Sequence, residues 1–252
     1  MKIHFSIDDV IGCLLYLTRH DCGSVFESYV FDFARSLWED FGIHTTCNCM
    51  YTDGVHDLRE VSAKFKSQFR ENSEWLKFSF HCFGPDSDYE KADRETFARD
   101  YQRVMGELKR IAGEEACAGD IVRLHFFAGS AETVGYLREQ GVRILLTADD
   151  GRRSYDLERE EEERLRRDGI ISKNGMTYIR TDCRAERPQQ VSNADGARKD
   201  GEHAEREMFV LFTHEGELGN QKIRDRICDT VRKQSETENH GRASSLFKTD
   251  NL

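Results

Sequence analysis

Short apolar runs alternate with longer amphipathic segments along most of the chain. The apolar runs are rich in β-branched and aromatic residues, which is typical of buried strands. We predict about seven strands: Ile3–Ile7, His44–Tyr51, Leu76–His81, Ile121–Phe127, Val142–Ala148, Met176–Thr181 and Met208–Thr213.

The segments between these runs carry apolar residues at helical spacing. Val25–Phe41, for example, has Val30, Phe33 and Leu37 on one face, and Gly42 ends it. Strands that alternate with helices indicate βαβ units and a parallel sheet. The residues after the first strand lack the glycine spacing of a dinucleotide-binding loop. We therefore predict an α/β fold, a distorted and incomplete (β/α) barrel of about seven strands, rather than an open doubly wound sheet.

One domain accounts for residues 1–234. Within it, Arg184–Glu207 is polar, charged and rich in Ala and Gly, and we predict a long inserted loop there. The sequence leaves open whether this loop covers a site or is plain disorder. Residues 235–252 are predicted to form a flexible C-terminal tail.

The net charge of -10 argues against nucleic acid or an anionic membrane as the main partner. No apolar run approaches the roughly 18 residues of a membrane span. The chain begins with a strand and shows no secretory leader, so we expect a cytoplasmic protein. The eight cysteines are then expected to be reduced, mostly buried thiols. Cys47 and Cys49 form no zinc knuckle, because that would need a second pair.

Polar side chains stand at the ends of five predicted strands. The carboxyl ends of barrel strands meet at one face, where the chemistry of such barrels takes place. Asp with His suits a borderline divalent cation such as zinc, with an open position for water. A free Asp can take a proton from that water, and a His opposite can protonate a leaving group. The strand-end residues are Asp8 and Asp9, His81, His125, Asp149 and Asp150, and His214.

The stretch Phe5-Ser6-Ile7-Asp8-Asp9-Val10 resembles T-F-D-D-G, the first motif of the polysaccharide deacetylases, the family-four carbohydrate esterases. The resemblance implies that Asp8 is the catalytic base and Asp9 a metal ligand. His81 matches the first ligand of the second motif, H-S/T-x-x-H. The second His of that motif is replaced by Pro85, and Asp86 follows it.

Three further motifs match in the family's order. R-x-P-x-G aligns with His125–Gly129, where His125 replaces the Arg, so Asp8 is expected to lack the family's usual charge partner. Asp149 falls where the family has an Asp that orients a catalytic Arg. L-x-H fits the residues 212–214, which implies that His214 is the general acid.

The resemblance implies metal-dependent hydrolysis of an N-acetyl or O-acetyl group on a carbohydrate. The matched motifs supply only two metal ligands, Asp9 and His81, whereas a catalytic zinc usually has three protein ligands. Either Asp86 or His125 completes the site, and we favour His125 because an imidazole at that strand end would point into the barrel mouth. Four aromatic residues are candidates to line the sugar site: Phe83, Tyr89, Phe126 and Phe127.

Two other functions fit the same pattern. The first is a catalytically degenerate barrel that only binds sugar, which the incomplete metal motif favours. The second is a metal-free glycosidase that pairs Asp9 with Asp149 or Glu215, at carboxyl separations of about 5–10 Å. A metallophosphoesterase would need more closely spaced His pairs than the sequence has.

Overall fold

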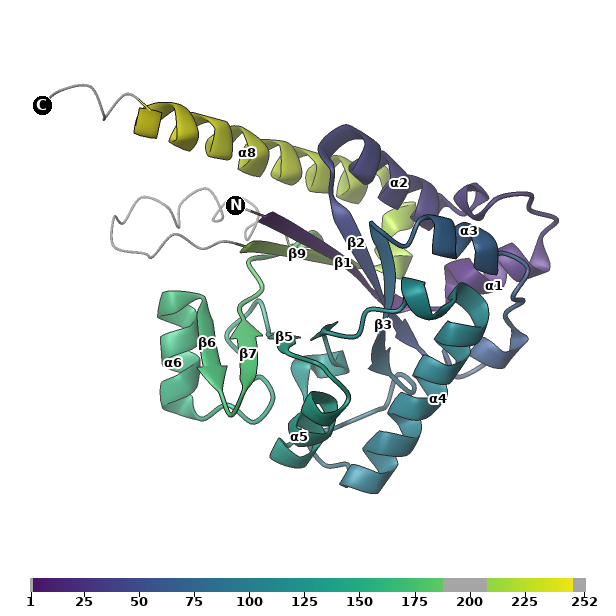
Figure 1. The fold of residues 1–252 in the computed structure, drawn as a ribbon, viewed down its shortest axis with the longest axis horizontal. Coiled ribbons are helices and arrows are strands. Elements are labelled where there is room, and N and C mark those ends of the chain that lie inside the picture. The colour runs from purple at the N-terminus through teal and green to yellow at the C-terminus, as the bar shows by residue number, and fades with distance from the viewer. Residues whose placement is uncertain (1, 188–207, 247–252) are drawn as a thin grey trace, which may run out of the picture.

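The computed structural model describes residues 2–187 and 208–246, and its central feature is a parallel sheet of five strands (Figure 1). All neighbouring pairs in this sheet are parallel. β1 lies at its centre between β2 and β9, and Phe5 and Ile7 of β1 are fully buried. The strand order is β3 (Leu76–Cys82), β2 (His44–Met50), β1 (Lys2–Val10), β9 (Met208–His214) and β8 (Cys183–Arg184).

A second sheet has four strands, of which only β6 is antiparallel to its neighbour. Its order is β4 (Ile121–Val122), β5 (Ile144–Leu146), β7 (Met176–Ile179) and β6 (Ile170–Lys173). Between the two sheets, β3 bonds to the segment just before β4, where the Ala118 N–H donates to the Phe78 carbonyl over 2.7 Å. In the described ranges no strand ladder joins them into a closed barrel. The incomplete (β/α) barrel predicted from the sequence is therefore confirmed.

Helices connect the strands, and their ends follow from local sequence. α2 (Tyr29–Phe41) ends at Gly42, whose φ of +67° is left-handed. α4 (Arg94–Ala112) begins after Asp93, whose carboxylate accepts the Thr96 N–H over 2.7 Å. The other α-helices are α1 (Gly12–Arg19), α3 (Lys66–Glu71), α5 (Ala131–Glu139), α6 (Arg159–Asp168) and α8 (Gln221–Leu246). Short 3₁₀ turns lie at Val25–Glu27, Leu58–Glu60, Glu114–Ala116, His125–Phe127 and Glu215–Gly219.

Several predicted boundaries differ from the structure. The strand predicted at Ile121–Phe127 stops at Val122, since Phe126 and Phe127 have φ values of +56° and +58°, which no strand accommodates. Between β2 and β3 the chain forms a 3₁₀ turn and the short helix α3. α8 continues to Leu246, through residues predicted to form a flexible tail. Of the predicted insertion, residues 188–207 lie outside the described residues.

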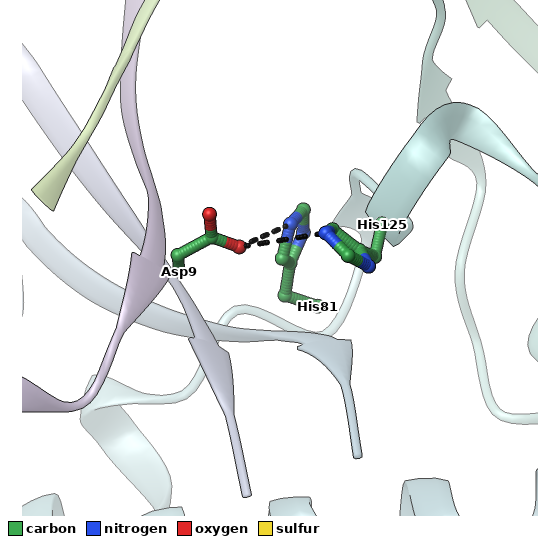
Figure 2. Close-up of side chains that lie close together, drawn as sticks. All are labelled: Asp9, His81 and His125. Carbon is green, nitrogen blue, oxygen red and sulfur yellow. Dashed lines mark ion pairs between the residues drawn. The ribbon is translucent and has the colours of Figure 1, made fainter. Parts of the chain in front are cut away.

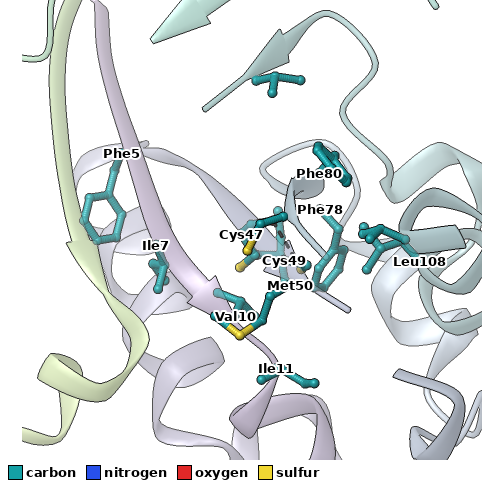
Figure 3. Close-up of a cluster of buried hydrophobic side chains, with 14 of the residues drawn as sticks. Phe5, Ile7, Val10, Ile11, Cys47, Cys49, Met50, Phe78, Phe80 and Leu108 are labelled. Atoms are coloured by element: carbon teal, nitrogen blue, oxygen red, sulfur yellow. Dashed lines mark hydrogen bonds between the residues drawn. The ribbon is translucent and has the colours of Figure 1, made fainter. Parts of the chain in front are cut away.

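The core packs apolar side chains of β1, β2 and β3 together (Figure 3). Cys47 and Cys49 are fully buried in it, and burial raises the pKa of both thiols. All eight cysteines are free, and six of them are buried. They are packing residues, as the sequence indicated. Among the described helices, none combines the length and apolar character that a membrane span requires.

Candidate metal centre

Asp9 and His81, near the ends of β1 and β3, converge with His125, the first residue of the 3₁₀ turn that follows β4 (Figure 2). One ligand atom from each lies within 4.8 Å of the other two. Oδ1 of Asp9 is 3.3 Å from Nε2 of His81 and 3.9 Å from Nε2 of His125. Two imidazoles and one carboxylate are a typical donor set of a catalytic zinc, which leaves a further position open. Among the described residues, no other group of this kind was found.

The backbone at Asp9 explains how two adjacent aspartates reach one site. Successive side chains of a regular strand point to opposite faces. Asp9 instead has a φ of +61°, and the pairing of β1 with β2 shifts register between Ile7 and Val10. Asp is one of the few residue types that adopt this left-handed conformation readily. The irregularity directs the Asp9 carboxylate toward His81 (Figure 2).

The hydrogen bond of His81 fixes which ring nitrogen faces Asp9. Nδ1 lies 2.7 Å from the carbonyl oxygen of Arg123, which can only accept, so Nδ1 carries a proton. In the neutral ring, Nε2 then presents its lone pair to the carboxylate of Asp9. Two acceptors at this distance need a positive charge between them, either a proton or a cation. Oδ1 of Asp9, the atom that faces both imidazoles, is also buried without a hydrogen-bond partner among the described residues. These residues therefore fit a divalent cation.

Burial and neighbouring charges shift the pKa of each of the three groups. Burial favours the neutral form of Asp9, but the imidazoles of His81, His214 and His125 outweigh it and lower the pKa to about 2. Burial also disfavours charge on His81, yet the carboxylates of Asp8 and Asp9 raise its pKa. Burial and the charge of His81 lower the pKa of His125, which keeps it in the neutral, ligating form.

Asp8 is buried beside a guanidinium that the motif alignment had missed. Nη1 of Arg123 lies 3.4 Å from Oδ1 of Asp8, and Nδ2 of Asn48 donates to the same oxygen over 2.7 Å. Arg123 is itself fully buried and donates to Ser6 Oγ (2.8 Å) and Thr181 Oγ1 (3.1 Å). The expectation that Asp8 lacks a charge partner was therefore wrong. The signal was an arginine inside an apolar run, two residues before His125.

His214 ends β9 and is held by Glu186, a residue that sequence analysis did not single out. Oε1 of Glu186 lies 3.1 Å from Nδ1 of His214 and accepts the His214 backbone N–H over 2.8 Å and the Thr213 hydroxyl over 2.7 Å. Burial lowers the pKa of His214, but this hydrogen bond and the charges of Asp8, Glu186 and Asp9 outweigh it and raise the pKa.

The two remaining acidic candidates are not part of the three-residue metal cluster. Asp149 is fully buried at its side chain, and its Oδ2 pairs with Nε of Arg184 (3.5 Å) and Nη1 of Arg187 (3.2 Å). Asp86 is exposed and lies outside the three-residue cluster. Of the two candidates for a third ligand, the structure places His125 beside Asp9.

The four aromatic candidates separate into two groups. Phe126 and Phe127 line a cavity of about 130 Å³ that also contacts Asp8, His81, His125 and His214. Phe83 lines a different cavity, of about 480 Å³, next to Tyr51. Tyr89 is 1% exposed, and its hydroxyl accepts the Phe83 N–H over 2.8 Å.

Glu215 has a structural role, and its carboxylate is therefore not available as the second catalytic carboxylate of a glycosidase. Its Oε2 accepts the N–H groups of Ile11 and Gly12, each over 2.9 Å, and Oε1 accepts that of Cys13. It thus caps the first turn of α1. With Asp149 also buried in ion pairs, the metal-free glycosidase hypothesis has no accessible second carboxylate among the residues proposed for it.

Known proteins resemble this chain in structure but not in sequence. No protein-family model matches the sequence, and no curated protein matches it. The chitin deacetylase of Colletotrichum lindemuthianum is similar in structure, with a TM-score of 0.51 at 10% identity over 92% of this chain and 81% of that chain. A CE4 family pseudoenzyme matches with a TM-score of 0.50 at 9% identity, over 92% of this chain and 63% of that one.

A 4-alpha-glucanotransferase from Thermococcus litoralis also matches, with a TM-score of 0.56 at 13% identity, over 92% of this chain but 36% of its own. At these identities the matches show the fold alone. They include a chitin deacetylase, a pseudoenzyme and a glucanotransferase. One fold therefore serves different functions, and the function of this chain has to be inferred from the residues of its site.

Proposed function

We propose that this chain, which has the fold of the polysaccharide deacetylases, is a metal-dependent hydrolase that removes an acetyl group from an acetylated sugar. One observation carries the proposal. The Asp9–His81–His125 cluster lies at the same strand ends as a buried carboxylate and a half-buried imidazole, and Asp8, His81, His125 and His214 line one cavity. Cation ligands, a base and an acid are the groups that such a hydrolysis needs.

Asp9, His81 and His125 would hold the cation, and zinc suits their donor atoms. A bound zinc supplies a Lewis acid that lowers the pKa of water and polarises a carbonyl oxygen. Asp8 accepts the proton of the attacking water. The Arg123 guanidinium and the Asn48 amide orient its carboxylate.

His214 donates the proton to the departing amine or alcohol. Glu186 holds Nδ1–H, so the Nε2–H of the imidazolium is the donor to the leaving group. The raised pKa of His214 keeps a larger fraction of the ring protonated near neutral pH. The phenyl rings of Phe126 and Phe127 would contact the sugar, because they line the same cavity.

Replacing Glu186 with Gln should move the alkaline limb of the pH–rate profile to lower pH. The acid must be protonated, so activity falls as the pH rises through the pKa of His214. Without the carboxylate of Glu186 that pKa drops, and the fall begins earlier. The imidazole resonances of His214, followed by NMR titration, check the cause. An unchanged alkaline limb in a folded Glu186→Gln variant would show that His214 is not the acid.

The proposal is tested by removing and restoring the metal. Acetate release from N-acetylated and O-acetylated sugars should disappear after treatment with a chelator and return when zinc is added back. Hydrolysis that is indifferent to the chelator would contradict a metal-dependent mechanism. Sugar binding without hydrolysis in the zinc-loaded chain would favour the degenerate sugar-binding barrel.

A further inference from the structure

Two guanidiniums line the cavity of the candidate metal centre. Arg152 and Arg184 contact this cavity of about 130 Å³ together with His81, His125 and His214. Arg152 belongs to the loop after β5, and Arg184 is the last residue of β8. Neither matches a motif of the resembled family, and neither serves as metal ligand, base or acid in the mechanism above.

Both guanidiniums are held in place by a carboxylate and an aromatic ring. Nε and Nη2 of Arg152 donate to the two oxygens of Asp150 over 2.8 and 2.6 Å, and its guanidinium carbon lies 5.8 Å from the Phe127 ring centroid. The Arg184 guanidinium carbon lies 4.8 Å from the centroid of Phe212. Nε of Arg184 is 3.5 Å from Oδ2 of Asp149. Such contacts order a long side chain before a ligand arrives.

We propose that Arg152 and Arg184 select an acetylated sugar that carries an anionic group, a carboxylate or a phosphate. The inference rests on the proposed function, in that the ligand is an acetylated sugar. A guanidinium has five N–H donors, and Asp150 engages two of the nitrogen atoms of Arg152, so donors remain for a ligand. Planar guanidiniums match carboxylate and phosphate oxygens, whereas the hydroxyl groups of a neutral sugar need no cation.

The chain as a whole repels such a ligand. Its net charge is -10, and Asp8 and Asp9 lie in or beside the cavity. An anionic sugar would therefore bind only if positive groups face it locally. The two arginines place guanidinium groups, each paired with one carboxylate, on the side of the cavity formed by the loop after β5 and by β8. The cation site lies at the ends of β1 and β3.

The test compares three ligands on the zinc-loaded chain by calorimetry: N-acetylglucosamine, N-acetylmuramic acid and N-acetylglucosamine 6-phosphate. We expect the carboxylate or the phosphate sugar to bind about tenfold more tightly than the neutral one. Arg152→Gln and Arg184→Gln should each remove most of this advantage and leave the neutral sugar unaffected. Which of the two charged sugars binds better identifies the anionic group.

Arg153→Gln is the matched control. Arg153 is the chain neighbour of Arg152 but pairs with Glu90 at 3.7 Å and does not line the cavity. Its replacement should leave all three affinities unchanged. Equal affinities for the three sugars, or an advantage that survives in both cavity variants, would overturn the inference. Turnover is measured separately: bound anionic sugar that is never hydrolysed would refute the proposed hydrolase and leave the anion preference intact.

Discussion

Replacing Asp8 with Asn should lower kcat/KM for an acetylated sugar by about 10²–10⁴-fold, the usual contribution of a positioned general base. Asparagine keeps the size of the side chain and its oxygen can still accept the hydrogen bonds of Arg123 and Asn48, but it cannot take a proton from water. The metal ligands Asp9, His81 and His125 are unchanged, so the variant should bind the same amount of zinc. Steady-state kinetics together with metal analysis check both parts.

Asp86→Asn is the matched control for this change. It also removes one aspartate from a strand-end loop, but Asp86 is exposed and lies outside the metal cluster. Its activity should equal that of the wild-type chain. An Asp8→Asn variant that retains full activity with bound zinc would show that Asp8 is not the base.

Replacing Arg123 with Met should lower the free energy of unfolding by about 3–5 kcal/mol, because it leaves the buried Asp8 carboxylate without its cation. Arg123 is fully buried and Asp8 is 2% exposed, so water cannot replace the lost interaction. The hydroxyls of Ser6 and Thr181 also lose their donor. Urea unfolding of the metal-free chain measures the change, since bound zinc would add its own stabilisation.

A second variant separates the ion pair from simple loss of packing. When Arg123→Met is combined with Asp8→Asn, the unpaired charge is gone, and the double variant should lose less stability than the sum of the two single variants. Additive losses would show that the pair is not coupled. A loss below about 1 kcal/mol for Arg123→Met alone would contradict its role as the partner of a buried charge.

The sheet at the centre of the fold could be predicted because its strands carry strong local signals. The runs that became β1, β3 and β9 are rich in apolar, β-branched or aromatic residues, whereas β2 consists mainly of Thr, Cys and Asn; both faces of these strands are covered. β4 was predicted too long for a different reason. Phe126 and Phe127 have a left-handed backbone conformation. A glycine would have indicated such a conformation in the sequence, but phenylalanine does not.

The turn at His125–Phe127 also explains why Arg123 was not predicted as a site residue. An alignment that placed His125 at the arginine of the third motif hid Arg123, which reaches Asp8 from two residues earlier in the chain. His125 could be named as a third ligand candidate because polar side chains at strand ends meet in a barrel. The choice between His125 and Asp86 depended on where the backbone turns, which spacing alone does not give.

Glu186 and Asp149 show that the order of motifs along the chain does not predict which charged residues pair with one another. Glu186 lies in a polar stretch predicted as a loop, where one glutamate among many charges gives no signal. Asp149 ends a predicted strand as the family pattern requires, and its carboxylate pairs with Arg184 and Arg187, which the sequence did not identify as its partners. The partners of buried charges come from segments distant in sequence, and their choice is a property of the fold rather than of local pattern.

The most direct test of the account is the zinc content and affinity of the purified chain, measured beside His81→Ala, His125→Ala and the control Asp86→Ala. We predict one tightly bound zinc per chain in the wild type and in Asp86→Ala. Removing the hydrogen-bond partner of a metal ligand usually weakens metal binding by roughly 10–100-fold. Each histidine variant loses a ligand itself, so its zinc affinity should fall by at least that factor. No zinc in the wild type under any loading condition, or zinc retained in His125→Ala and lost in Asp86→Ala, would contradict the Asp9–His81–His125 centre.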